Sequence, residues 1–157
     1  MKKDQIQRKL TAILVADVVG YSKMMANDDE ATLLALRTHR REVFDPEIRN
    51  HNGRIVKLMG DGTLVEFNSI VDAVSCAVAI QQKQSGIDGA IELRIGVNLG
   101  DIIVDADDIY GDGVNVASRL EAHAEPGGIC IASVVYQSLD NRAKTEFIDT
   151  GEHEFKN

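Results

Sequence analysis

An apolar run broken by one carboxylate is the strongest constraint on the fold of this 157-residue chain. Residues 12–19 read Ala-Ile-Leu-Val-Ala-Asp-Val-Val, and their Ile, Val and Leu content predicts a central strand over residues 10–19. Asp17 lies inside that strand, where a buried carboxylate costs several kcal/mol unless a cation or hydrogen-bond donors compensate it. Asp61 lies between two further strand-like segments. Two such aspartates suggest a bound cation.

Composition and charge narrow the classes of function. The chain is 44% hydrophobic and 27% charged, which suits one compact domain with its own core. The formal net charge of −8 argues against a nucleic-acid partner and against an anionic membrane surface, because either would need a concentrated basic face. No apolar stretch approaches the roughly 20 residues that span a bilayer, so we expect a soluble, cytoplasmic domain without membrane contact.

Strand and helix patterns alternate along the chain. Apolar periodicity predicts a helix over residues 29–50, with Leu33, Leu36, Val43 and Phe44 on one side and Asp28 or Asp29 as its cap. Gly60-Asp61-Gly62 predicts a hairpin turn between two short strands. The remaining expected elements are strands 54–59, 63–67, 91–98, 101–104 and 129–132, and helices 70–84 and 114–124.

The order of these elements predicts the fold class. A β-α-β-β-α-β series with appended elements fits an α/β (α+β) domain with a ferredoxin-like or palm-type core. We therefore expect a central, mostly antiparallel sheet with helices on one face.

Three sequence blocks in this order resemble the catalytic domain of the class III nucleotidyl cyclases, the adenylyl and guanylyl cyclase superfamily. They read ILVADVVGYS at residues 13–22, GRIVKLMGDG at 53–62 and DIYGDGVNVASRLE at 108–121. The resemblance covers the chain from Ala12 to about Lys156. It implies a single catalytic domain over residues 1–157. The family continues with one more strand, so we expect a piece of a longer protein that also carries regulatory domains.

The resemblance assigns a metal site to the two aspartates. In the family, the residues that match Asp17 and Asp61, with the backbone carbonyl of Val18, hold two Mg²⁺ or Mn²⁺ ions per site. Mg²⁺ prefers a few carboxylates plus substrate phosphates, which agrees with this assignment. The alternative is that backbone donors cap Asp17 and that Asp61 is an ordinary turn residue.

Lys57 and Asp108 resemble the pair that selects the purine. An ammonium group donates to adenine N1 and a carboxylate accepts from the N6 amine, whereas guanine presents the opposite pattern. The pair therefore predicts ATP as the substrate. Asp107 is the rival for the acidic role if the register slips by one residue, and solvated side chains are the alternative for both positions.

The last block implies the transition-state residues. Asn115 and Arg119 are four residues apart in a predicted helix, so their side chains share a face. In the family the matching asparagine orients the ribose and the matching arginine stabilises charge at the pentavalent phosphorus. The alternative is a solvent-facing helix side that pairs Arg119 with a glutamate. Asp112 fits an N-cap of that helix. Lys156 resembles the lysine that contacts the triphosphate.

The resemblance also implies a head-to-tail homodimer with two composite sites, in which one chain supplies the metal aspartates and its partner the other groups. The expected activity is conversion of ATP to 3′,5′-cyclic AMP and pyrophosphate. Two alternatives stay open from the sequence. One is a guanylyl cyclase, and the other is a catalytically silent domain that binds nucleotide or dimerises to carry a signal.

Overall fold

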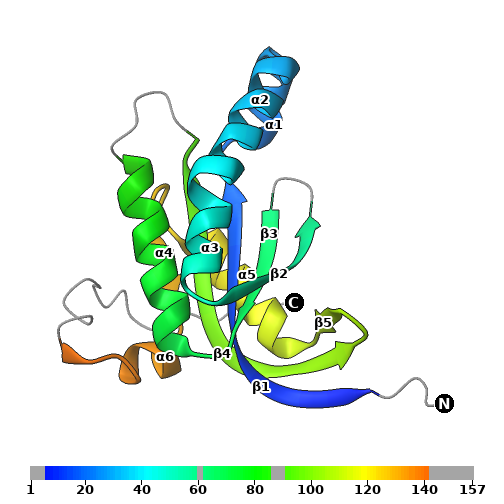
Figure 1. The fold of residues 1–157 in the computed structure, drawn as a ribbon, viewed down its shortest axis with the longest axis vertical. Coiled ribbons are helices and arrows are strands. Elements are labelled where there is room, and N and C mark those ends of the chain that lie inside the picture. Colours follow the sequence, from blue (N-terminus) through cyan, green and yellow to red (C-terminus); the bar gives the residue numbers. More distant parts are fainter. Residues whose placement is uncertain (1–5, 60–61, 86–90, 142–157) are drawn as a thin grey trace.

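Strand β1 (Gln7–Val18) runs through the middle of the sheet and organises the domain (Figure 1). The computed structural model describes residues 6–59, 62–85 and 91–141. Within these residues six strands form one sheet in the order β2-β3-β1-β4-β5, and β6 pairs with β4. The other strands are β2 (Gly53–Met59), β3 (Gly62–Phe67), β4 (Leu93–Asp105), β5 (Asp108–Tyr110) and β6 (Ile129–Ile131). The helices are α1 (Tyr21–Asn27), α2 (Asp29–His39), the π-helical turn η1 (Arg40–Phe44), α3 (Asp45–Asn50), α4 (Ile70–Ser85), α5 (Asp112–His123) and α6 (Ser133–Gln137).

The strand order confirms the predicted fold class. Strands β1, β2, β3, β4 and β5 pair antiparallel with their neighbours, and β6 pairs parallel with β4. The hairpin β2–β3 and the long pair β1–β4 give the arrangement of a ferredoxin-like βαββαβ core. The strands predicted at residues 54–59 and 63–67 and the helix predicted at 70–84 are each present within one or two residues.

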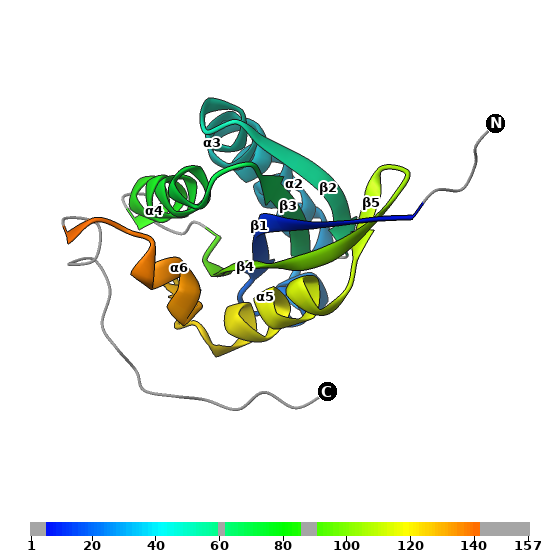
Figure 2. The ribbon, with the colours of Figure 1, turned by 90° about the horizontal axis from the view of Figure 1, so that it is seen from below.

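Alternate side chains of β1 enter two different cores. Leu14 packs in a cluster with Phe44, Ile48 and Ile80, on the face covered by η1, α3 and α4. Ile13 and Val15 point to the opposite face, where the cluster includes Ala117 of α5. Figure 2 shows α3 and α4 on one side of the sheet and α5 on the other. The expectation that helices cover one face only was wrong for α5, because residues 12–16 of β1 are apolar at every position and so need cover on both faces of the sheet.

The helix predicted over residues 29–50 is present but not uniform. Asp28 caps its start, accepting a hydrogen bond from the Ala31 N–H at 3.0 Å. Pro46 has no N–H for the carbonyl four residues earlier, and the π-helical turn η1 lies beside that interruption. Leu33 is 45% exposed, although the periodicity placed it with the core residues. It belongs to α2, which Figure 1 shows projecting beyond the sheet.

Strand β4 is longer than the sequence suggested. Two strands, 91–98 and 101–104, were predicted on either side of Leu99 and Gly100, but Gly100 is needed for the close approach of α5 and does not end the strand. A Cβ on Gly100 would lie 2.9 Å from Cα of Gly113 in α5. The short elements α1, β5 and α6 were not predicted. None of the helices in the described part of the chain combines the length and the apolar character of a membrane span.

Candidate active site

Asp17 lies at the end of β1, at the edge of the core. Its side chain is half-buried, and its Oδ1 accepts a hydrogen bond from the Val18 N–H at 3.0 Å. In the sheet register Asp17 stands opposite Gly62 of β3 and Arg94 of β4. Asp61, the residue before Gly62, lies outside the described residues. Within the described ranges no group of three or more His, Cys, Asp or Glu residues is placed to hold a metal ion.

A β-bulge in β2 turns Lys57 toward the α5 face of the sheet. Ile55 pairs with Val65, and Lys57 pairs with Leu64, so Val56 is the extra residue. Residues directly opposite each other in a pair of strands point to the same face, and Leu64 belongs to the cluster under α5. Without the bulge, strict alternation would send Lys57 to the other face together with Ile55. The bulge therefore aims the lysine.

Lys57 meets Asp108 of β5 across the curled sheet. The lysine Nζ lies 3.1 Å from each carboxylate oxygen of Asp108, and the two side chains are 35% and 31% exposed. The Nζ also lies 5.0 Å from the centre of the Tyr110 ring. Strands β2 and β5 stand at opposite ends of the path β2-β3-β1-β4-β5, so this contact requires the sheet to curl.

The ion pair keeps Asp108 ionised. Burial raises the pKa of Asp108, but hydrogen bonds from Lys57, from Tyr110 and from the Ile109 N–H outweigh it, and the pKa is lowered overall. Hydrogen bonding to the Asp108 carboxylate raises the pKa of Tyr110. The pair still has capacity for a ligand, because an ammonium carries three donors and a carboxylate accepts at about four lone-pair positions. It thus offers one donor and one acceptor side by side.

Helix α5 carries Asn115 and Arg119 on the side away from the sheet. Ala117, on the sheet side, is fully buried, whereas Asn115 is exposed and Arg119 half-buried. A Cβ on Gly96 of β4 would lie 2.4 Å from the Glu121 backbone nitrogen of α5, so glycine lets the helix approach the sheet. Asp112 is the first residue of the helix. Asp112 was predicted to be the N-cap, but the N-cap in the structure is Gly111, at φ 117°.

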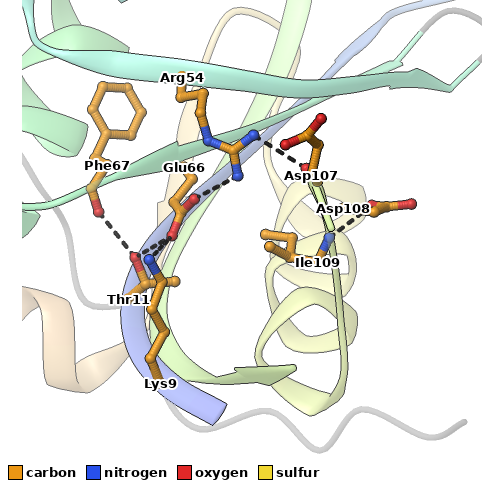
Figure 3. Close-up of polar contacts among 8 residues, drawn as sticks. All are labelled: Lys9, Thr11, Arg54, Glu66, Phe67, Asp107, Asp108 and Ile109. Atoms are coloured by element: carbon orange, nitrogen blue, oxygen red, sulfur yellow. Dashed lines mark hydrogen bonds and ion pairs between the residues drawn. The ribbon is translucent and has the colours of Figure 1, made fainter. Parts of the chain in front are cut away.

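Three residues around the pair were not predicted from the sequence: Arg54, Glu66 and Tyr110. Arg54 donates to Glu66 and to the backbone carbonyl of Asp107, immediately before Asp108 (Figure 3). Tyr110 had a signal in the sequence, because it follows Asp108 by two residues in a strand and so shares its face. Arg54 and Glu66 had no such signal in the sequence, because their pairing depends on the register of β2 against β3. Lys156 lies outside the described residues.

Comparisons with known proteins agree with this fold. The sequence model of the adenylate and guanylate cyclase catalytic domain matches residues 4–157. "Putative adenylate cyclase 3" of Rhizobium meliloti is 48% identical over 163 aligned positions, which cover all of this chain and 28% of that protein. An adenylate cyclase of Glutamicibacter nicotianae is 30% identical, over 85% of this chain and 33% of its own length. The chain thus spans about a third or less of these two relatives.

Solved structures of cyclases also have this fold. An adenylate/guanylate cyclase/hydrolase from Silicibacter pomeroyi superposes with a TM-score of 0.90 at 42% identity, covering 98% of this chain and 92% of its own. The adenylyl cyclase CyaB from P. aeruginosa superposes with a TM-score of 0.73 at 28% identity, covering 85% and 81%. The chain belongs to the adenylate and guanylate cyclase catalytic domain family, the class III nucleotidyl cyclases.

Proposed function

We propose that this domain is an adenylyl cyclase that converts ATP to 3′,5′-cyclic AMP and pyrophosphate. The observation that carries the proposal is the contact between Lys57 Nζ and the Asp108 carboxylate at 3.1 Å. Adenine needs a donor for N1 beside an acceptor for the N6 amine, and this pair supplies both. Guanine has a carbonyl where adenine has the amine, and that carbonyl would face the ionised Asp108. A polar group that the bound base covers would then be left unpaired, at a cost of about 1–3 kcal/mol. The geometry favours Asp108 over Asp107, which presents its backbone carbonyl to Arg54.

A divalent cation fits the other end of the site. Asp17 is a half-buried carboxylate, and its register partner Gly62 is the residue next to Asp61. Carboxylate and carbonyl oxygens are the donors that Mg²⁺ and Mn²⁺ prefer. Asp17, Asp61 and the carbonyl of Val18 would hold two ions. When bound, the ions supply Lewis-acid chemistry, lowering the pKa of the ribose 3′-hydroxyl and neutralising the leaving pyrophosphate.

The remaining groups have roles around the α-phosphorus. The 3′-oxygen forms a bond to that phosphorus, the bond to the β-phosphate oxygen breaks, and the hydroxyl proton leaves to solvent. Asn115 orients the ribose. Arg119 stabilises the charge that develops on the pentavalent phosphorus, for which a planar guanidinium with several donors is suited. Lys156 contacts the triphosphate.

The strand register supports a site shared between two chains. Asp17 stands opposite Gly62, and Lys57 stands opposite Leu64. Gly62 and Leu64 are two residues apart on β3, a distance of about 7 Å along the strand. The base and the triphosphate lie at opposite ends of ATP, so one nucleotide does not place its base on Lys57 and its phosphates on Asp17 of the same chain. In a head-to-tail homodimer each nucleotide takes its metal aspartates from one chain and Lys57, Asp108, Asn115 and Arg119 from the other.

The proposed activity is tested by incubating the domain with ATP or GTP and Mn²⁺ over a range of protein concentrations. The products are identified by chromatography. Asp17→Ala is the blank. Cyclic AMP from ATP is the expected product, with a rate per chain that rises with concentration because each site needs two chains. Cyclic GMP as the main product would overturn the base assignment. Absence of any cyclic nucleotide from a dimer that binds ATP would overturn the proposed activity in favour of a signalling domain.

Mixing two inactive variants tests the shared site. Asp17→Ala and Arg119→Ala chains each lack one half of the site, and a heterodimer of the two has one site with both defects and one intact site. We expect activity to return on mixing, up to about a quarter of the wild-type rate per chain if dimers exchange freely. Heterodimers that form, as shown by differently tagged chains, but remain inactive would exclude this model.

A further inference from the structure

Glu66 is a carboxylate buried in β3 and is connected through Arg54 to the hairpin that carries Asp108. Its side chain is 7% exposed and accepts hydrogen bonds from three groups (Figure 3). Lys9 Nζ lies 2.8 Å from Oε2, Arg54 Nη2 lies 2.8 Å from Oε1, and Thr11 Oγ1 lies 3.1 Å from Oε2. The carboxylate is buried, whereas the Lys9 and Arg54 side chains are each 48% exposed. Taking a carboxylate out of water is costly even when it is paired, so we look for the use of this cluster in what it positions.

Arg54 links this cluster to the hairpin that carries Asp108. Its Nη2 is held by Glu66, and its Nη1 donates to the Asp107 carbonyl at 3.1 Å. A guanidinium holds its donors in one rigid plane, so fixing one end on Glu66 also fixes the direction of the other end. Figure 3 shows the guanidinium between Glu66 and the segment of Asp107 and Asp108.

The β4–β5 hairpin needs such support. Its turn has Ala106 at φ 57°, a left-handed conformation that is unfavourable for alanine. Strand β5 is three residues long and, among the strands of the described residues, pairs only with the end of β4. Asp108 is the first residue of β5, directly after the carbonyl that Arg54 binds. A shift of this turn would move the Asp108 carboxylate relative to Lys57.

We propose that Arg54, held by Glu66, is a positioning residue that keeps the Asp108 carboxylate beside Lys57 and thereby sets the preference for ATP over GTP. The inference rests on the proposed function for its substrate, and on the contacts above for its geometry. Arg54 acts through Asp108 and touches neither the base nor the reacting phosphate.

The decisive variants are Arg54→Ala and Arg54→Lys. In Arg54→Ala the ratio of kcat/KM for ATP to that for GTP is expected to fall about tenfold, because the acceptor for N6 is no longer held. Arg54→Lys keeps the charge next to Glu66, but a single ammonium does not reproduce the two-ended contact. It is expected to recover thermal stability without recovering selectivity. Arg41→Ala is the matched control, since it removes the same charge from an exposed pair with Glu42 and should leave the ratio unchanged.

A double-mutant cycle separates positioning from general damage. If Arg54 acts through Asp108, the Arg54→Ala change has no further effect on the ATP to GTP ratio in an Asp108→Asn background. Losses that multiply in the double variant would overturn the proposal. So would a selectivity loss in Arg54→Ala that Arg54→Lys fully restores, because charge alone would then explain it.

A second readout does not depend on catalysis. The Asp108 carboxyl carbon is followed by NMR as the pH is lowered, in wild type, Arg54→Ala and Arg54→Lys. Both variants should titrate Asp108 at a higher pH than wild type does, as its contact with Lys57 loosens. An unchanged titration would refute the positioning role. If the wild type makes no cyclic nucleotide, the proposed function fails, while this titration still decides the positioning role.

Discussion

Replacing Gly96 with alanine tests the approach of α5 to the sheet, on which the position of Asn115 and Arg119 depends. The added Cβ would lie 2.4 Å from the Glu121 nitrogen, 2.5 Å from the Ala117 oxygen and 2.9 Å from the Glu121 Cα. All three atoms are backbone, so no side chain can turn away to make room. Ordinary contact distances would require the helix to move by about 1 Å.

The size of the effect follows from these contacts. Overpacking against a rigid backbone is expected to cost about 3 kcal/mol, the upper end of the usual range. Alanine has less conformational freedom than glycine in the unfolded chain, and this stabilises the folded state by about 0.5–1 kcal/mol. The net loss is about 2 kcal/mol, or a melting temperature about 4–8 °C lower for a domain of this size. A shift of about 1 Å in Asn115 and Arg119, the proposed transition-state residues, would also lower turnover by up to about 100-fold.

Urea unfolding of Gly96→Ala at a fixed protein concentration measures the loss, with cyclase turnover as the second assay. Ala122→Ser is the control, because it adds one heavy atom to the exposed side of the same helix and should change stability by less than about 0.5 kcal/mol. A Gly96→Ala protein within about 0.5 kcal/mol of wild type would refute the reasoning, since α5 would then not lie against β4.

Three further predictions concern pH and metal. Burial raises the pKa of Glu66, but hydrogen bonds from Lys9, Arg54 and Thr11 outweigh it, and the pKa is lowered from 4.5. Its contribution to stability is therefore present above pH 4.5 and lost as the pH falls through the lowered pKa. In urea unfolding, Glu66→Gln should be about 2 kcal/mol less stable than wild type at neutral pH, with the gap closing in acid. Burial also lowers the pKa of His39 from 6.5, so the protonated form disfavours folding. Wild type should lose stability as the pH falls below 6.5, and His39→Gln should show a shallower slope there. Mn²⁺ at ten times its Kd should raise the free energy of unfolding by about 1.4 kcal/mol in wild type and not in Asp17→Ala, and a chelator should abolish turnover reversibly.

The sequence predicted the elements whose pattern is local. The strand around Asp17, the β2–β3 hairpin and helix α4 each have a period or a turn signal within a few residues. Strand β5 is three residues long, too short for any period, and was missed. Gly100 looked like a break in β4, because a glycine that admits a neighbouring backbone and a glycine that ends a strand look alike in the sequence.

Part of the candidate site could likewise be predicted from the sequence, and part could not. Lys57 and Asp108 were predicted as a pair from the family resemblance, and the structure brings them into contact. The roles of Asp17, Asn115 and Arg119 stay predictions. The contacts of Arg54 and Glu66 could not be predicted from the sequence, because they depend on the strand register and on the curl of the sheet, which no local pattern encodes.

The curl of the sheet makes the proposed selection of the base depend on two strands from opposite ends of the sheet. Lys57 and Asp108 are 51 residues apart and come from the two ends of the strand path, whereas Asp17 and Gly62 face each other on central strands. The proposed metal end of the site therefore rests on the paired central strands β1 and β3, and the proposed base end on a short edge hairpin. Conditions that loosen that edge first, such as protonation of Glu66, should relax the preference for ATP before metal binding is lost. Mn²⁺ binding and the ATP to GTP ratio, followed together as the pH is lowered, should thus separate, with selectivity failing first. A simultaneous loss would show that the two ends of the site unfold as one unit.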